Sequence, residues 1–359
     1  MMKITFLLPY VNDLAGGLRV VAQHAQYLLN EGHSVTLVGQ KKMRPTGLRA
    51  TLRRLMRREP PFQEIEGQDH FSSRGLDVVL FPTDHVLGPE DLPDADVIVA
   101  TWWQTVEAFR NLPPEKGVQA HFIQDHEVFP NLPRDRVEAV YRRPTHKIVV
   151  ASWLERVMRE NYDQPAHLAV NGVDTTVFRM PERHRGHPPC MGFLNTRTPR
   201  KNIELAVAAM EAARRRRPDL RCIAFGSHPA SELPDWIEFE QRPSQSRIPE
   251  IYGACDAWLF PSITEGFGLP ILEAMSCGTP VLAARAGAAE DLVTRENGRL
   301  LERDPEIFAE AILEMAGMDD ANWTAMSRAA RRTAEAHDLA PASARFEAVL
   351  TEIAATPRG

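Results

Sequence analysis

The chain has 359 residues, 43% hydrophobic and 25% charged, which is enough for two soluble globular domains. Its formal net charge of −6 argues against nucleic acid as the main partner, because phosphate backbones select basic surfaces. No apolar run approaches the ~20 residues that span a bilayer. Met1–Tyr10 has one lysine and is broken by Pro9, which is typical of a strand rather than a signal peptide. We therefore expect a cytoplasmic protein.

The N-terminal half begins with a βαβ pattern. The apolar run Lys3–Leu8 predicts a strand, and the helical spacing over Leu18–Glu31 predicts a helix. Ser34–Val38 predicts the next strand, so the sheet should be parallel with a right-handed crossover. Further short apolar runs predict strands at Asp77–Phe81, Asp96–Ala100, Ala120–Ile123 and Lys147–Val150.

The pattern then restarts. A turn at Asn171–Asp174 and a stretch rich in proline, histidine and arginine up to Pro189 predict an interdomain linker. Beyond it, apolar runs predict strands at Met191–Leu194, Leu220–Phe225, Ala257–Phe260 and Pro280–Ala283. Two successive βαβ halves predict an α/β protein made of two doubly wound domains.

The most informative segment is the glycine-rich loop Glu265–Glu273. Pro270 suits a first helical position and Gly278 suits a helix end, so the loop should lead into a helix N-terminus. Glycine N–H groups and the free donors of a helix N-terminus suit a diphosphate, and the flanking carboxylates suit sugar hydroxyls. On local physics alone, a plain strand–loop–helix connection explains the segment equally well.

This loop resembles the Glu-x7-Glu motif of retaining GT-B glycosyltransferases of family four, the glycosyltransferases group 1. The resemblance extends over Ile251–Asp256 and Pro261–Val281, and covers the C-terminal half more fully than the N-terminal half. It implies the GT-B fold, with two Rossmann-like domains facing across a cleft. Residues 1–172 would form the acceptor domain and residues 173–340 the donor domain, with a helix over 341–356 packing back on the first.

The resemblance also implies roles for the residues of the loop. In the family, the first glutamate and the Gly-Phe-Gly backbone hold the donor sugar, and the second glutamate holds the ribose. Here the sugar would be held by Glu265, Gly266, Phe267 and Gly268, the phosphate by the N–H of Leu269, and the ribose by Glu273.

Basic residues follow the predicted strand Met191–Leu194. A departing nucleoside diphosphate accumulates negative charge, so catalysis needs fixed cations or a metal. The family has an arginine followed by a lysine here, which implies Arg197 and Lys201. The spacing in this chain is one residue shorter, so Arg200 remains a rival to Arg197, and a solvated basic loop is the alternative.

A metal is the other means of stabilising that charge. The Asp-Ala-Asp sequence over 94–96 has the form of a metal site but precedes a strand instead of following one. We therefore expect no metal, and no cofactor beyond the nucleotide-sugar as co-substrate.

Three segments of the N-terminal half follow predicted strands and should share one sheet edge. Gly16 and Gly17 resemble the family's Gly-Gly loop, which meets donor phosphate or acceptor, and the absence of a G-x-G-x-x-G pattern counts against a redox dinucleotide. Packing at the edge of the core explains Trp102 and Trp103 slightly better than an acceptor pocket does.

The third segment leaves its polar contact open among Gln124, Asp125 and His126, because the family's histidine is displaced here by one or two residues. The surrounding run Phe122–Glu127 is similar to bacterial rhamnosyltransferases of this family, which implies a deoxyhexose donor.

A basic stretch, Lys41–Arg58, carries eight Lys or Arg and no acidic residue. A peripheral helix on anionic lipid at the inner face of the membrane and a solvated loop explain it equally well.

Taken together, the resemblance implies retaining, metal-independent transfer from a nucleotide-sugar to a hydroxyl of a saccharide or lipid-linked acceptor, in bacterial polysaccharide or glycoconjugate synthesis. The alternatives are a nucleotide-sugar epimerase on the same fold and a non-catalytic nucleotide-sugar binding protein.

Overall fold

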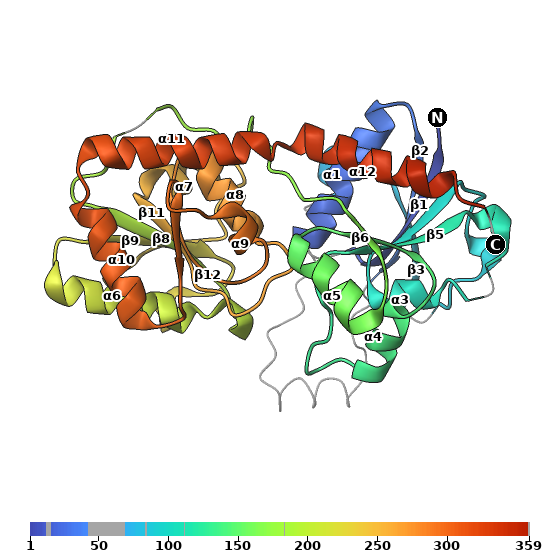
Figure 1. Cartoon of the computed structure of the whole chain (residues 1–359), viewed down its shortest axis with the longest axis horizontal. Coiled ribbons are helices and arrows are strands. Elements are labelled where there is room, and N and C mark those ends of the chain that lie inside the picture. The colour runs from blue at the N-terminus through green and yellow to red at the C-terminus, as the bar shows by residue number, and fades with distance from the viewer. Residues whose placement is uncertain (12–15, 42–68, 83–84, 111, 183, 358–359) are drawn as a thin grey trace. The chain divides into compact units, whose positions relative to one another are not determined.

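Two parallel β-sheets organise the chain in the computed structural model, which describes residues 1–11, 16–41, 69–82, 85–110, 112–182 and 184–357. The chain divides into two units (Figure 1). The first contains Met1–Val149, Glu155–Ala169 and Ser343–Gly359, and the second contains Val150–Leu154 and Val170–Ala342. The expected α/β fold class, with two doubly wound Rossmann-like sheets, is confirmed.

A seven-stranded parallel sheet in the order β3-β2-β1-β4-β5-β6-β7 forms the first unit. Its strands are β1 (Lys3–Tyr10), β2 (Ser34–Lys41), β3 (Val78–Pro82), β4 (Val97–Ala100), β5 (Val118–Ile123), β6 (His146–Val149) and β7 (Ala166–Leu168). The central strand β4 is buried at every position, as a parallel strand covered by helices on both faces must be.

The helices of the first half are α1 (Gly16–Asn30), α3 (Trp103–Glu107), α4 (Arg134–Tyr141) and α5 (Ser152–Tyr162). Short 3-10 turns occur at Ser72–Arg74, Pro89–Asp91 and Pro114–Lys116. The helix α1 connects β1 to β2, and its buried side chains recur with helical spacing along one face.

The C-terminal helix α12 (Leu339–Ala354) packs against α1 in the first unit (Figure 1). The ring of Phe346 stacks on His24 of α1 with 4.4 Å between centroids, and it lies 4.9 Å from the ring of Phe122. Burial lowers the pKa of His24 to about 3, so its ring is neutral and packs as part of the core.

A six-stranded parallel sheet in the order β10-β9-β8-β11-β12-β13 forms the second unit. Its strands are β8 (Cys190–Asn195), β9 (Arg221–Gly226), β10 (Glu238–Gln241), β11 (Ala257–Phe260), β12 (Val281–Ala284) and β13 (Gly298–Leu301). Its helices are α6 (Ile203–Arg216), α7 (Ile248–Ala254), α8 (Leu269–Ser276), α9 (Ala289–Leu292), α10 (Pro305–Gly317) and α11 (Asp320–Ala336), with 3-10 turns at Pro199–Lys201 and Ala230–Glu232.

The helices of the second unit cover both faces of its sheet. The connections β8-α6-β9 and β11-α8-β12 leave the centre of the sheet in opposite directions. Right-handed crossovers therefore place α6 and α8 on opposite faces. Accordingly, α6 packs on α10, whereas α8 packs on α11 (Figure 1).

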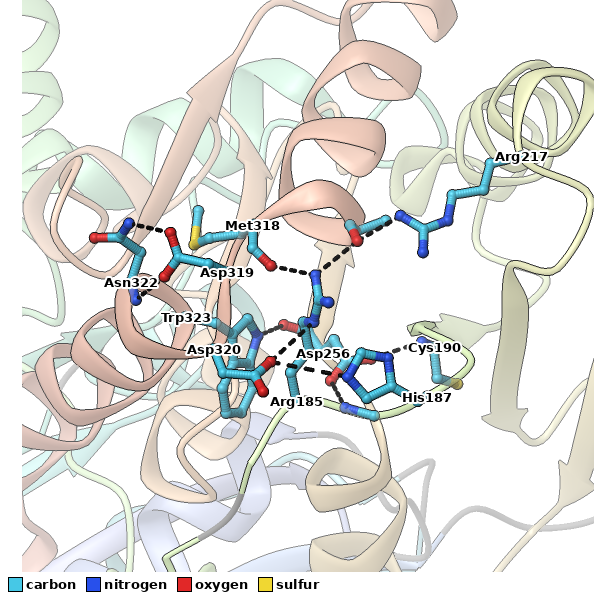
Figure 2. Close-up of polar contacts among 12 residues, drawn as sticks. Arg185, His187, Cys190, Arg217, Asp256, Met318, Asp319, Asp320, Asn322 and Trp323 are labelled. Atoms are coloured by element: carbon cyan, nitrogen blue, oxygen red, sulfur yellow. Dashed lines mark hydrogen bonds and ion pairs between the residues drawn. The ribbon is translucent and has the colours of Figure 1, made fainter.

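The stretch before β8 is bound to the second unit, which corrects the expectation of an interdomain linker there. The carboxylate of Asp256 accepts hydrogen bonds from the backbone N–H groups of Gly186 and Cys190, each at 2.7 Å (Figure 2). Arg185 donates to two carbonyl oxygens at the C-terminal end of α10. These bonds satisfy irregular backbone and the end of a helix, and so fix the stretch in place.

The structure contains edge strands that the sequence pattern does not predict, namely β7, β10 and β13. They are three or four residues long and only partly buried, so they carry no extended apolar run. Within the described ranges, no helix is both long and apolar enough to cross a membrane. The basic stretch Lys41–Arg58 lies outside the described residues beyond Lys41, so its membrane role stays a prediction.

Candidate active site

The second unit brings four loops to one edge of its sheet. The strand order reverses between β8 and β11, and open α/β sheets bind ligands at the carboxyl ends of strands beside such a reversal. The loops that follow β8, β9, β11 and β12 all leave from this edge. They contain Arg197–Lys201, His228, Glu265–Gly268 and Arg285–Ala288, respectively.

The loops after β8 and β11 are joined by backbone contacts. The N–H of Ile263 donates to the carbonyl of Arg200 at 2.7 Å, and the side-chain amide of Asn202 donates to the carbonyl of Pro261 at 3.3 Å. Asn202 has a φ of 54°, a left-handed conformation that asparagine tolerates, and it starts α6 directly after the 3-10 turn at Pro199–Lys201. This local turn directs Lys201 toward the neighbouring loop.

Lys201 and Glu265 form an ion pair at this edge. The Nζ of Lys201 lies 2.5 Å from Oε1 of Glu265, which also accepts a hydrogen bond from the hydroxyl of Ser262 at 2.8 Å. The lysine side chain is 20% exposed and the glutamate 6%. Two residues predicted from separate motifs are therefore in direct contact, and the lysine side chain is the more exposed of the two.

Arg197 is held by a different partner. Its Nε donates to Nδ1 of His228 at 2.9 Å, and Nε2 of His228 lies 3.0 Å from a carboxylate oxygen of Glu232. A ring nitrogen that accepts from arginine must be unprotonated, so the proton of a neutral ring would lie on Nε2, the nitrogen nearer Glu232. The hydrogen bond from His228 lowers the pKa of Glu232. This chain orients the Arg197 guanidinium.

The glycine-rich loop leads into α8 through Gly268. Its φ is +96°, and a Cβ there would lie 2.8 Å from the ring of Phe260. Glycine is therefore required both by the left-handed backbone and by the close packing. The helix begins at Leu269, with Pro270, which has no N–H, in its first turn. The N–H of Ile271 donates to the carbonyl of Gly268 at 2.9 Å.

Two further contacts fix the backbone of this loop. The indole N–H of Trp153 donates to the carbonyl of Gly266 at 2.8 Å. The N–H of Ala288 donates to the carbonyl of Phe267 at 2.8 Å, and Gly287, at a φ of +59°, would place a Cβ only 2.5 Å from the same carbonyl oxygen. Hydrogen bonds from the rest of the unit thus hold the carbonyl groups of Gly266 and Phe267.

Glu273 lies on α8 and is 5% exposed. The hydroxyl of Tyr252, from α7, donates to its Oε2 at 2.8 Å. The structure thus joins Lys201 directly to Glu265, whereas Arg197 and Glu273 are held by His228 and Tyr252.

In the first unit, Gly16 and Gly17 start α1 at the carboxyl end of β1. The side-chain amide of Gln124, which follows β5, donates to the carbonyl of Gly17 at 3.1 Å. His126 instead lies 2.7 Å from the hydroxyl of Tyr162, and burial lowers its pKa. Of the three polar candidates after β5, Gln124 therefore contacts Gly17 at the start of α1.

The two tryptophans after β4 have different environments. Trp103 is 2% exposed, and its backbone N–H donates to the buried carboxyl of Glu127 at 2.8 Å. Burial raises the pKa of Glu127 well above its ordinary value. Its hydrogen bond with Trp103 connects the segment after β5 to the segment after β4. Trp102 is partly exposed and lines a surface pocket.

The Asp-Ala-Asp sequence lies at the opposite edge of the first sheet. Asp94 pairs with Lys116 at 2.9 Å, and Asp96 accepts a hydrogen bond from the N–H of Lys3 at 2.8 Å. Both aspartates precede β4, away from the carboxyl ends where the candidate residues lie.

Three residues that contact the site were not predicted from the sequence. His228 follows a predicted strand, so the criterion of strand ends could have found it. Gly287 follows β12 in the same way. Trp153 has no such signal, because its contact with Gly266 depends on the tertiary fold.

Comparison with known proteins places this geometry in context. Residues 189–317 match the family model described as Glycosyl transferases group 1. The chain is 30% identical over 183 residues to the lipopolysaccharide core biosynthesis mannosyltransferase LpsB of Rhizobium meliloti, covering 44% of this chain and 52% of that protein. It is 33% identical over 134 residues to a phosphatidyl-myo-inositol mannosyltransferase of Propionibacterium freudenreichii, covering 36% and 35%. The matches span about half the length of these relatives or less.

Solved structures resemble the chain over nearly its whole length. Sucrose-phosphate synthase from Thermosynechococcus elongatus superposes with a TM-score of 0.74 at 18% identity, covering 98% of this chain and 99% of that one. The Anabaena protein HepE in complex with UDP and glucose superposes with a TM-score of 0.75 at 16% identity, covering 98% and 100%. At such identities the likeness concerns the fold, which is of the GT-B type.

Proposed function

We propose, from the premise that this chain belongs to the glycosyl transferases group 1 family, that it transfers a sugar from a nucleotide-sugar to an acceptor hydroxyl. The observation that carries the proposal is the pair of Lys201 and Glu265, which meet at the strand-order reversal of the second sheet, beside the N-terminus of α8. A lysine cation, a carboxylate and a helix N-terminus in one place suit a sugar diphosphate.

The reaction needs few groups from the protein. The bond between the sugar C1 and the diphosphate oxygen breaks with its electron pair moving to the diphosphate, while the acceptor oxygen bonds to C1. In our proposal Lys201 and Arg197 stabilise the charge on the leaving group, and N–H groups of Gly266 to Leu269 assist them. Glu265 orients the sugar and Glu273 the ribose. A diphosphate oxygen takes the acceptor proton on the same face, so configuration is retained and no metal is required.

The proposed substrates follow from the same chemistry and from the relatives. Both named relatives are mannosyltransferases that act in lipopolysaccharide or phosphatidylinositol chemistry. We propose a hexosyl or deoxyhexosyl donor and a saccharide or lipid-linked acceptor, with a role in bacterial polysaccharide or glycoconjugate synthesis at the cytoplasmic side of the membrane. Gln124 is proposed as the polar contact of the first unit, next to Gly16 and Gly17.

The test is incubation of the full chain with UDP-glucose, GDP-mannose or dTDP-rhamnose. Octyl mannoside and a polyprenyl diphosphate-linked sugar serve as acceptors, with and without EDTA. We expect one donor to yield a glycoside whose anomeric configuration, read by NMR, matches the donor and whose yield EDTA does not change.

The alternatives give different products. An epimerase would convert the nucleotide-sugar without releasing nucleoside diphosphate, and a binding protein would show thermal stabilisation without turnover. Either result would refute the transferase proposal, and inhibition by EDTA would refute its metal-independent form.

A further inference from the structure

The first unit has a pocket of about 900 Å³ at the carboxyl ends of β1, β2 and β4. Leu8, Val86, Trp102 and Val140 contribute apolar lining on several sides. Arginines from α4 and from the segments after α3 and α4 line it as well, and α3 and α4 pack against each other (Figure 1). The pocket is therefore amphipathic, and positively charged side chains outnumber negatively charged ones in its described lining.

The charges of this lining do not balance. Arg136 is neutralised by Glu107, to which it donates through Nε at 3.2 Å and Nη2 at 2.7 Å. Arg143 donates through Nη1 to the carbonyl of Val106 at 2.7 Å, which uses one of its five N–H donors. Among the described residues, no carboxylate lies within ion-pair distance of Arg110 or Arg143. Two guanidinium groups thus remain in excess of the lining acids.

These two cations also affect each other. Burial, and then the charge of Arg110, lower the pKa of Arg143, and the charge of Glu107 partly offsets them. Arg143 nevertheless stays protonated because arginine does not lose its proton in proteins. Arg110 is exposed and Arg143 is partly buried. Two neighbouring cations repel each other until an anion bridges them. Guanidinium groups match the geometry of phosphate oxygens and bind them through paired hydrogen bonds.

The nearby carboxylate of Asp91 is already engaged. Asp91 accepts from His85 at 2.7 Å and from the N–H of Gly88 at 2.8 Å, and so faces the backbone of its own turn. Asp91 therefore does not offset the positive charge on the side of the pocket formed by α3 and α4.

We propose that this pocket binds a phosphate ester, with Arg110 and Arg143 as its oxyanion ligands and the apolar lining against the group that carries the phosphate. The inference deepens the proposed function, on which it rests, by naming the acceptor class: a phosphorylated saccharide or a phospholipid-linked one. The two sources share one chemistry, and the experiment separates them.

Binding is measured directly on the full chain, without donor, so that the result does not depend on turnover. Glycerol 3-phosphate is titrated by calorimetry, and vesicles of phosphatidylcholine with or without phosphatidylglycerol are tested by flotation. The variants are Arg110→Gln and Arg143→Gln, with Arg142→Gln as the matched control. Arg142 is adjacent in sequence and loses the same charge, but it pairs with Glu138 and does not line the pocket.

We expect Arg110→Gln and Arg143→Gln each to raise the Kd of the phosphate ester or of the anionic vesicle about tenfold, because a charge-assisted hydrogen bond is lost. Arg142→Gln should stay within about twofold. Binding of the soluble ester identifies a saccharide phosphate, and binding of the vesicle alone identifies a lipid headgroup. Equal affinities in Arg110→Gln and Arg142→Gln would overturn the inference.

A second comparison separates this inference from the proposed function. Lys201→Ala removes the cation proposed for the donor diphosphate and should leave the affinity for glycerol 3-phosphate unchanged. If Lys201→Ala abolishes that affinity while Arg110→Gln does not, the anion binds in the second unit and the pocket is not its site. If the chain lacks transferase activity but the arginine dependence holds, the pocket stands and the proposed function fails.

Discussion

The ammonium group of Lys201 contacts Oε1 of Glu265 at 2.5 Å, although the two residues are 64 positions apart. The contact joins the loop after β8 to the loop after β11, the two strands between which the strand order reverses. A buried carboxylate thus aligns the cation on which the proposed chemistry depends.

Replacing Lys201 by alanine should lower kcat/KM by about 100-fold or more, because the leaving diphosphate loses a fixed charge. Glu265→Gln should also lower it, and the double variant should lose less than the product of the two single losses, since the residues are in contact. Steady-state kinetics on the purified chain measures this. Arg216→Ala, on the exposed side of α6, is the control and should keep full activity. Strictly multiplicative losses would contradict the coupling.

Glu273 offers a test of ribose recognition. Glu273→Gln keeps an oxygen that can accept from Tyr252 but loses the charge, so the affinity for a nucleoside diphosphate should fall about tenfold. Inorganic pyrophosphate, which has no ribose, should bind the variant and the wild type equally in a calorimetric titration. Tyr252→Phe removes only the supporting hydrogen bond and should have the smaller effect. A parallel loss of pyrophosphate affinity would show that Glu273 acts on the phosphates or on the fold instead.

Two glycines with similar backbones differ in their surroundings, which gives a matched pair. Gly287 and Gly75 have φ values of +59° and +66°, but a Cβ at Gly287 would lie 2.5 Å from the carbonyl oxygen of Phe267, whereas Gly75 has nothing within 4 Å. Gly75→Ala should cost only the roughly 1–2 kcal/mol of a left-handed alanine. Gly287→Ala should cost more and also displace the loop at Phe267, which weakens nucleoside diphosphate binding. Urea unfolding and calorimetry compare the two, and equal costs with unchanged binding would refute the role of Gly287.

Lys147 predicts a pH dependence of stability. It is fully buried on β6, and burial followed by the charge of Arg143 lowers its pKa to about 7, below its ordinary value of 10.5. Between these two values the unfolded chain binds a proton that the folded chain has released, so stability should rise with pH and be lost as the pH falls through about 7. The slope should be about 1 kcal/mol per pH unit.

The measurement is the free energy of unfolding in urea between pH 7.5 and pH 9.5. In Lys147→Met this part of the slope should disappear. Because Nζ of Lys147 donates to the carbonyl oxygens of Arg143 and Thr145 and to the Thr145 hydroxyl, the methionine variant leaves these acceptors without that donor. Its absolute stability is therefore not the readout. An unchanged slope in Lys147→Met would mean that a group other than Lys147 causes this pH dependence.

Much of the fold follows from local patterns. The predicted strand Ala257–Phe260 is β11 without change, and the predicted helix over 341–356 lies within two residues of α12. The spacing of apolar residues and the presence of turn residues reflect the structure of the nearest few positions. Central parallel strands are also easy to recognise because they consist of continuous apolar runs. Edge strands such as Glu238–Gln241 lack such runs and depend on a neighbour for pairing, so they appear only in the folded chain.

Packing likewise determines which contacts the polar residues after β5 make. The sequence leaves Gln124, Asp125 and His126 open. In the fold, the histidine ring meets the hydroxyl of Tyr162, and the glutamine amide reaches Gly17. In the same way, His228 contacts Arg197 because β9 pairs with β8.

The sequence alone determined the two sheets, the glycine-rich loop before α8, and the candidates Lys201, Glu265 and Glu273, because strand ends, glycines and charges are local properties that the parallel topology collects at one edge. Only the tertiary structure decided which of these residues touch, which side chains hold them, and where two arginines remain in excess of the lining acids. Those outcomes depend on contacts between residues far apart in the chain, and such contacts exist only once the strands have found their neighbours.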